Sequence, residues 1–187
     1  MSSKHRHDPD QDHLTAGYER MLQRLREQFA GTTDGGPRLE EALEGIKQRM
    51  IDSGELAADE AEHVARSLLR DLREAGAWLA DRSHQHPLRD WLRMDLQMLE
   101  SWLWEAFSSV ADRTSMELRG FVTTGEPSLY HTGEIAGPGE LRCIACGRTV
   151  HFTRPGHIPP CPACNHSEFV RAPHTEDTSE PDDSDKA

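Results

Sequence analysis

Residues 143–165 read CIACGRTVHFTRPGHIPPCPACN, and this stretch holds all four cysteines of the chain. They form two pairs, Cys143 with Cys146 and Cys161 with Cys164, and each pair encloses two residues. A Cys-x-x-Cys pair places two sulfurs within reach of one ion about 2.3 Å from each. The pattern therefore predicts that four thiolates bind one metal ion, Zn²⁺ in the leading interpretation.

Iron is the alternative ion, because four thiolates around a single ion also suit Fe. His151, His157 and His166 lie close by in the sequence and are substitute ligands in principle. With four cysteines present, we interpret these histidines as surface or packing residues. A closed set of four thiolates leaves no open coordination position, so the predicted metal role is structural and no catalytic residue is assigned.

The residues around the cysteines indicate a zinc ribbon. Gly147 and Asn165 each follow a cysteine pair, and both residue types tolerate the positive φ that lets backbone N–H groups point at the sulfurs. Residues 148–152 and 168–171 are typical of short strands, being β-branched and aromatic. So small a unit has too little core to fold without its ion.

The preceding sequence predicts helices from apolar residues at helical spacing. Asp59 and Glu62 have the spacing of a capping box at the start of the third helix. The polar face of this helix, with Arg66, Arg70, Arg73 and Glu74, is expected to lie in solvent. A fourth, long helix is expected from Pro87 to about residue 118 with a heptad-like seam that is typical of a coiled coil. The apolar stripes are Leu14, Tyr18, Leu22, Leu25 and Phe29; Leu39, Leu43, Ile46 and Met50; Ala61, Val64 or Ala65, Leu68, Leu72, Ala75 and Leu79; and Leu88, Leu92, Leu96, Leu99, Leu103, Ala106 and Val110.

The expected fold is therefore mostly α: an N-terminal helical bundle or hairpin with a long helix, followed by a small β zinc ribbon. Glycines and prolines after Arg119 predict a linker that holds a short strand near Tyr130. Both ends of the chain are polar and are expected to be disordered. The predicted segments are 1–13, disordered; 14–120, helical domain; 121–139, linker; 140–172, zinc ribbon; and 173–187, disordered acidic tail.

Composition and charge narrow the function classes. The 187 residues carry a formal net charge of -12, and the ribbon region holds four arginines against two glutamates. The chain has no clustered Lys and Arg of the kind that gives phosphate binding its affinity. We expect no membrane contact, because no apolar run approaches the roughly 20 residues of a membrane span. The start lacks a secretory signal and the cysteines are paired as ligands, so the expected location is cytoplasmic.

Several segments resemble a known family. Residues 130–135 (YHTGEI), 137–139 (GPG), 158–162 (IPPCP) and the first cysteine pair with Gly147 are similar to the uncharacterised bacterial zinc-ribbon-containing family of YbeL-like proteins. The likeness extends over residues 14–171, through YERM at 18–21, DWLR at 90–93 and SVAD at 109–112. Asn165 stands where this family more usually has glycine. The resemblance implies a helical domain followed by a C-terminal zinc ribbon in a cytoplasmic protein, and it implies no reaction.

The leading functional hypothesis is a non-enzymatic interaction or regulatory module that binds another protein, with zinc purely structural. The long helix also suits a homodimer. One alternative is a nucleic-acid-binding regulator, in which four arginines and two phenylalanines form a basic stacking face; these are Arg142, Arg148, Arg154, Arg171, Phe152 and Phe169. Another is a rubredoxin-like iron protein that transfers single electrons.

Overall fold

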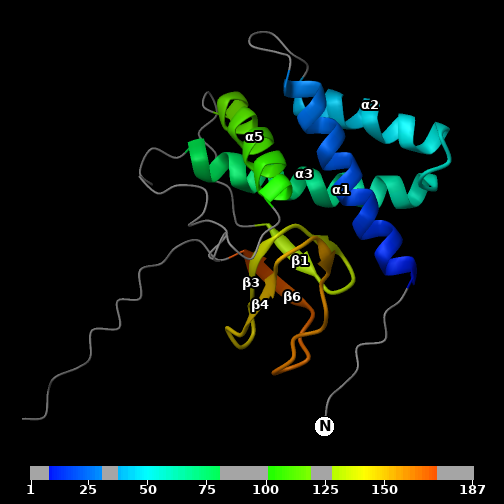
Figure 1. The fold of residues 1–187 in the computed structure, drawn as a ribbon. Helices are drawn as coiled ribbons and strands as arrows, with labels where there is room; N and C mark the ends of the chain where they lie inside the picture. The colour runs from blue at the N-terminus through cyan, green and yellow to red at the C-terminus, as the bar shows by residue number, and fades with distance from the viewer. Residues whose placement is uncertain (1–8, 31–37, 81–100, 119–127, 172–187) are drawn as a thin grey trace, which may run out of the picture.

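The computed structural model describes residues 9–30, 38–80, 101–118 and 128–171. Helices occupy the N-terminal part and lie together on one side, while the strands follow and lie on the other side (Figure 1). The elements are α1 (Pro9–Ala30), α2 (Leu39–Asp52), α3 (Ala58–Ala80), α5 (Ser101–Leu118), β1 (Leu129–His131), β2 (Ile135–Ala136), β3 (Gly139–Cys143), β4 (Thr149–Phe152), β5 (Gly156–His157) and β6 (Glu168–Arg171). The expected fold class, helical first and a small β region last, is confirmed.

The helical core is built from the stripes that the sequence predicts. Tyr18, Leu22 and Leu25 of α1 are fully buried, as are Ile46 and Met50 of α2. Among the helices that the structure describes, α3 lies at the centre and contacts α1, α2 and, most extensively, α5. Apolar residues at helical spacing give each helix one buried face, so the helices assemble by covering these faces.

In α5, the described part of the predicted long helix, the apolar seam packs against other helices of the same chain. Leu103, Ala106 and Val110 of α5 are fully buried in the helical core. Gly76 of α3 sits directly under α5, where an added Cβ would lie 2.5 Å from the Thr114 side chain. The first part of the predicted helix, Pro87 to residue 100, lies outside the described residues. Among the described helices, none has the length and apolarity required to cross a membrane.

Two helix starts differ from the sequence-based expectation. Helix α1 begins at Pro9, so residues 9–13 are helical where disorder is predicted. Helix α3 begins at Ala58, and Glu60 accepts the backbone N–H of Ala57 at 2.7 Å. The capping bond is therefore made by Glu60 rather than Glu62, because the helix starts before Asp59. Glu62 is instead paired with Lys47 of α2 at 2.7 Å.

The β region consists of two small antiparallel sheets. Strands β1, β6, β3 and β4 form the larger sheet in that order, and β2 pairs with β5. The strands predicted at 148–152 and 168–171 are confirmed as β4 and β6. In the described part of the segment predicted as a linker, 121–139, the short strand expected near Tyr130 is present as β1, and β2 and the first residue of β3 lie there as well. The ribbon therefore begins at β1, whose pairing with β6 joins segments about forty residues apart in sequence.

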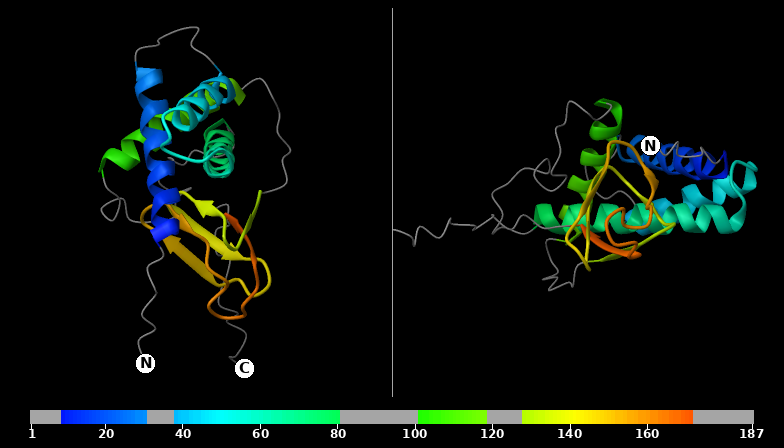
Figure 2. Two further views of the ribbon diagram at one scale, coloured as in Figure 1. Left: turned by 90° about the vertical axis from the view of Figure 1, so that its right-hand side faces the viewer. Right: turned by 90° about the horizontal axis from the view of Figure 1, so that it is seen from below.

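The ribbon packs directly against the helices (Figure 2). Strand β2 contacts α3, strand β5 contacts α1, and Ile135 of β2 is part of the helical core. Arg70 of α3 donates to the Ile135 carbonyl at 3.0 Å and lies 3.8 Å from the centroid of the Tyr130 ring. Arg70 and Glu74 are thus largely covered by the ribbon, whereas the sequence places them in solvent. The ribbon therefore contacts both α1 and α3.

Candidate metal centre

Two turns of equivalent geometry present the four cysteines. In the first turn, the Gly147 N–H donates to the Cys143 carbonyl at 2.9 Å and the Cys143 N–H donates to Arg148. In the second turn, the Asn165 N–H donates to the Cys161 carbonyl at 2.8 Å, and the Cys161 N–H donates to the carbonyl five residues on. We call these turns the first knuckle (residues 143–148) and the second knuckle (residues 161–166).

The positive φ expected after each cysteine pair is confirmed. Gly147 has φ 74° and Asn165 has φ 60°. Glycine adopts this conformation without a Cβ penalty, and asparagine tolerates it better than most residues. Asn165 therefore gives the second knuckle the backbone shape that glycine gives the first.

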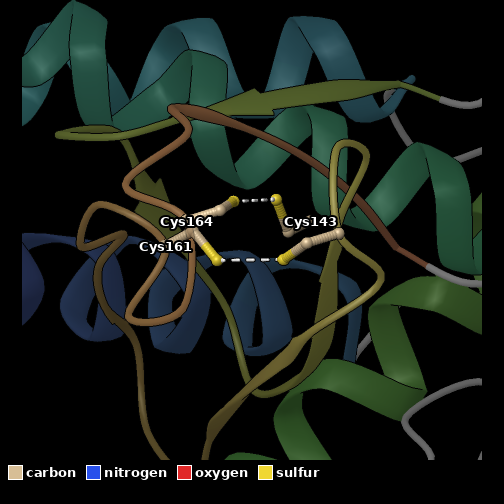
Figure 3. A group of neighbouring side chains, drawn as sticks. Cys143, Cys161 and Cys164 are labelled. Atoms are coloured by element: carbon tan, nitrogen blue, oxygen red, sulfur yellow. Dashed lines mark hydrogen bonds between the residues drawn. The ribbon is translucent and has the colours of Figure 1, made fainter.

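The four sulfurs converge on one point between the knuckles. All four lie within 4.8 Å of one another. The Sγ atoms of Cys143 and Cys164 are 3.6 Å apart, and those of Cys146 and Cys161 are 3.5 Å apart (Figure 3). Sulfurs bound tetrahedrally at about 2.3 Å are separated by about 3.8 Å, so the donor set fits one tetrahedral ion with small adjustments. All four thiols are free of disulfide bonds.

Hydrogen bonds at the site change the pKa values of two of the thiols. Burial opposes ionisation of Cys161, but the N–H groups of Ala163 and Cys164 and the nearby thiols lower its pKa to about 6. The His166 N–H favours ionised Cys164, whereas hydrogen bonds with the neighbouring thiols raise the pKa of Cys164 to about 12. The opposite shifts arise because the hydrogen bonds among the thiols favour the thiolate of Cys161 and the neutral thiol of Cys164, which donates to its neighbours.

The cysteine pairs differ in their exposure. Cys143 and Cys161, the first cysteine of each pair, are buried, while Cys146 and Cys164 are exposed. The two buried cysteines, the first of each pair, belong to the ribbon core together with Tyr130, Phe152 and Phe169. An ion at this site would link the ribbon core to the knuckle tips at the surface.

The histidines near the cysteines have other partners. His151 Nδ1 lies 2.9 Å from a carboxylate oxygen of Glu140, and His157 Nδ1 lies 3.0 Å from the Gly133 carbonyl. His166 Nε2 lies 3.4 Å from Glu168. Within the described parts of the chain, the cluster of metal-ligating groups consists of the four cysteines alone.

The proposed basic stacking face does not form as a unit. Arg171 is 4% exposed, and Phe169 is fully buried in the ribbon core. Phe152 is also buried, which removes both aromatic rings from the surface. Among the arginines of this hypothesis, Arg148 and Arg154 are exposed. The sequence could not separate buried from exposed positions here, because a strand of four residues gives few periods of alternation.

Comparison with known proteins supports this description of the site. The family model described as "Zinc-ribbon containing domain" matches residues 26–173. Similar proteins are the uncharacterised protein YbeL of Escherichia coli strain K12 and its counterparts in strains O6:H1 and O157:H7. Each is 30% identical over 137 residues, covering 70% of this chain and 80% of the relative. No solved structure matches. The chain therefore belongs to the zinc-ribbon family that includes YbeL.

Proposed function

We propose that this protein is a non-enzymatic interaction module of the cytosol whose ribbon is held by one structural Zn²⁺ and binds another protein. The convergence of four sulfurs carries the structural part of the proposal, because four thiolates complete the coordination of zinc and leave no position for substrate or water. A cytosolic location suits these thiols, since reducing conditions keep them available to a metal ion.

The knuckle tips supply the surface for a partner. Ile144 lies at the tip of the first knuckle and is 48% exposed, next to exposed Ala145. Pro162 and Ala163 are exposed at the equivalent positions of the second knuckle. One ion bound to both knuckles would hold these four exposed apolar residues at fixed positions, and we call them the knuckle patch. Apolar side chains fixed on a rigid turn are suited to protein contact.

Charge favours a protein over a nucleic acid as the partner. The chain has a formal net charge of -12. Arg171 is held in the interior, so it cannot neutralise a phosphate. Binding to nucleic acid draws on several exposed cations in one place.

The test compares two substitutions of exposed apolar residues. Ile144→Glu changes the knuckle patch, and Leu129→Glu is the matched control on β1, where the side chain is 47% exposed. Full-length tagged protein is expressed at low level, cross-linked in cells and purified with bound proteins quantified. We expect a partner that the wild type and Leu129→Glu recover equally and that Ile144→Glu recovers about tenfold less, with unchanged zinc content.

Three results would contradict the proposal. Equal recovery with Ile144→Glu would show that the knuckle patch is not the binding surface. Salt-sensitive binding of DNA or RNA in a gel-shift assay would favour the nucleic-acid alternative. Purified protein that is red and is bleached by dithionite would favour the rubredoxin-like iron site.

A further inference from the structure

A carboxylate buried between the helices and the ribbon holds the two parts together. Asp71 of α3 is fully buried. Its Oδ2 accepts the Tyr18 hydroxyl of α1 at 2.9 Å and the Gly137 N–H of the ribbon at 2.6 Å. Its Oδ1 accepts the Tyr130 hydroxyl of the ribbon at 2.8 Å. A buried carboxylate needs such donors, because its transfer from water is otherwise very unfavourable.

A buried arginine of the ribbon compensates the charge of Asp71. The guanidinium of Arg171 lies 3.6 Å from Asp71 and 3.7 Å from Glu74, and it donates to the Pro138 carbonyl at 2.8 Å. Burial alone would lower the pKa of Arg171, but Tyr130, Asp71 and Glu74 raise it, so the group stays charged. Three residues of the ribbon, Tyr130, Gly137 and Arg171, and Tyr18 of α1 therefore depend on α3 for hydrogen bonds or charge balance.

Strands β3 and β6 connect the groups around Asp71 to the first knuckle. Gly137 and Pro138 immediately precede β3, and Cys143 is the last residue of β3. In the larger sheet, Phe169 of β6 pairs with both Tyr130 and Cys143. Gly137 is thus connected to Cys143 along β3, and Tyr130 is connected to Cys143 through their shared pairing partner Phe169.

The second knuckle is also connected to the helices. Ile135 is buried in the helical core and pairs with His157 of β5. The Ile158 N–H donates to the Glu134 carbonyl at 2.9 Å, and Cys161 follows three residues later. Each half of the cysteine site is therefore anchored to the helical core through a short segment.

We infer that Asp71 and Gly137 are positioning residues for the metal site, although neither belongs to the cysteine cluster. Docking of the ribbon on α3 fixes the strands that bring the knuckles together. By linkage, an ion held by both knuckles stabilises the docked ribbon to the same extent that docking strengthens metal binding. This inference stands apart from the proposed partner, because it concerns only the full chain and its ion.

Two glycines provide a matched pair of variants. An added Cβ at Gly137 would lie 2.5 Å from the Tyr18 hydroxyl and 3.0 Å from Asp71 Oδ2. At Gly76 it would also lie 2.5 Å from the nearest atom, in this case of Thr114 in the contact of α3 with α5. Both Gly→Ala changes force the neighbours apart, but only the first acts at the contact between helices and ribbon.

The experiment measures how fast zinc passes from the loaded full-length protein to a coloured chelator. We expect Gly137→Ala and Asp71→Asn to accelerate zinc release at least about fivefold. Gly76→Ala should lower the thermal midpoint yet leave release within about twofold of the wild type. Equal acceleration by Gly76→Ala and Gly137→Ala would overturn the inference, because metal retention would then follow global stability.

A second test uses the wild-type protein and does not depend on the folding of any variant. Hydrogen exchange of the wild-type protein is compared between the zinc-bound state and the state after chelation. We expect chelation to increase exchange in α1 around Tyr18 and in α3 around Asp71, and to leave α2 unchanged. Identical protection of α1 and α3 in both states would overturn the inference, whatever partner the protein binds.

Discussion

Replacement of Arg171 by methionine should destabilise the whole protein. The change removes a charge that is 4% exposed, with its hydrogen bonds to Pro138 and Tyr130, and leaves Asp71 and Glu74 without this cation. Breaking a buried ion pair in this way costs about 3–5 kcal/mol. Arg70 Nε lies 3.7 Å from Asp71 and offsets part of the loss, so we expect about 3 kcal/mol.

Urea unfolding at pH 7 in saturating zinc, followed by helical circular dichroism, measures this change. A double-mutant cycle with Glu74→Gln measures the coupling between Arg171 and Glu74. In the double variant, Glu74→Gln removes the carboxylate charge that Arg171→Met leaves without a partner. The expected coupling is about 1–2 kcal/mol. A loss below about 1 kcal/mol, or strictly additive effects of the two substitutions, would refute the assignment of Arg171 as the buried counter-charge.

Three further predictions concern the interface, the second knuckle and the pH dependence of stability. Ile135→Ala should lower the free energy of unfolding by about 2–5 kcal/mol in a helical signal, although the residue belongs to the ribbon; an unchanged helical midpoint would separate the two parts. Asn165→Ala should destabilise by about 1 kcal/mol at φ 60° and hasten zinc release, while Asn165→Gly should do neither; equal behaviour of the two would argue against backbone strain. Burial lowers the pKa of His63, so its contribution to stability is present above the unfolded pKa of about 6.5 and is lost as pH falls through the folded pKa. His63→Gln should therefore lose less stability than the wild type when pH is lowered from 7 in urea titrations; parallel curves would contradict this.

Much of the site could be predicted from sequence because its signals are local. The spacing of the cysteines, Gly147 and Asn165 depends on a few neighbouring residues, and the structure confirms the turns and brings the four sulfurs together. The apolar stripes of α1 and α2 are likewise local patterns and are confirmed as buried faces.

The interface between helices and ribbon could not be predicted, because its partners are far apart in sequence. The hydrogen bonds to Asp71 come from residues 53 to 66 positions away in the sequence, and no short sequence pattern predicts them. One local signal was available: Asp71 lies between Leu68 and Leu72 on the apolar stripe of α3, where a carboxylate is out of place unless it has buried partners.

The full extent of the ribbon before β3 could not be predicted for a related reason. Glycines and prolines are typical of linkers, but Gly137 is required here because the Tyr18 hydroxyl and Asp71 occupy the space of a Cβ. The sequence indicates β1 as a short strand near Tyr130, whereas β2 has two residues, which is too short for an alternating pattern to stand out.

Native mass spectrometry of the untagged full-length protein, with Cys143→Ser and Cys161→Ser measured beside it, determines whether the four cysteines bind one ion. We expect one zinc ion per wild-type chain and its loss in both variants, which remove one ligand from each knuckle. A wild-type chain without metal, or a variant that keeps its ion, would contradict the assignment of the four cysteines to a single metal site.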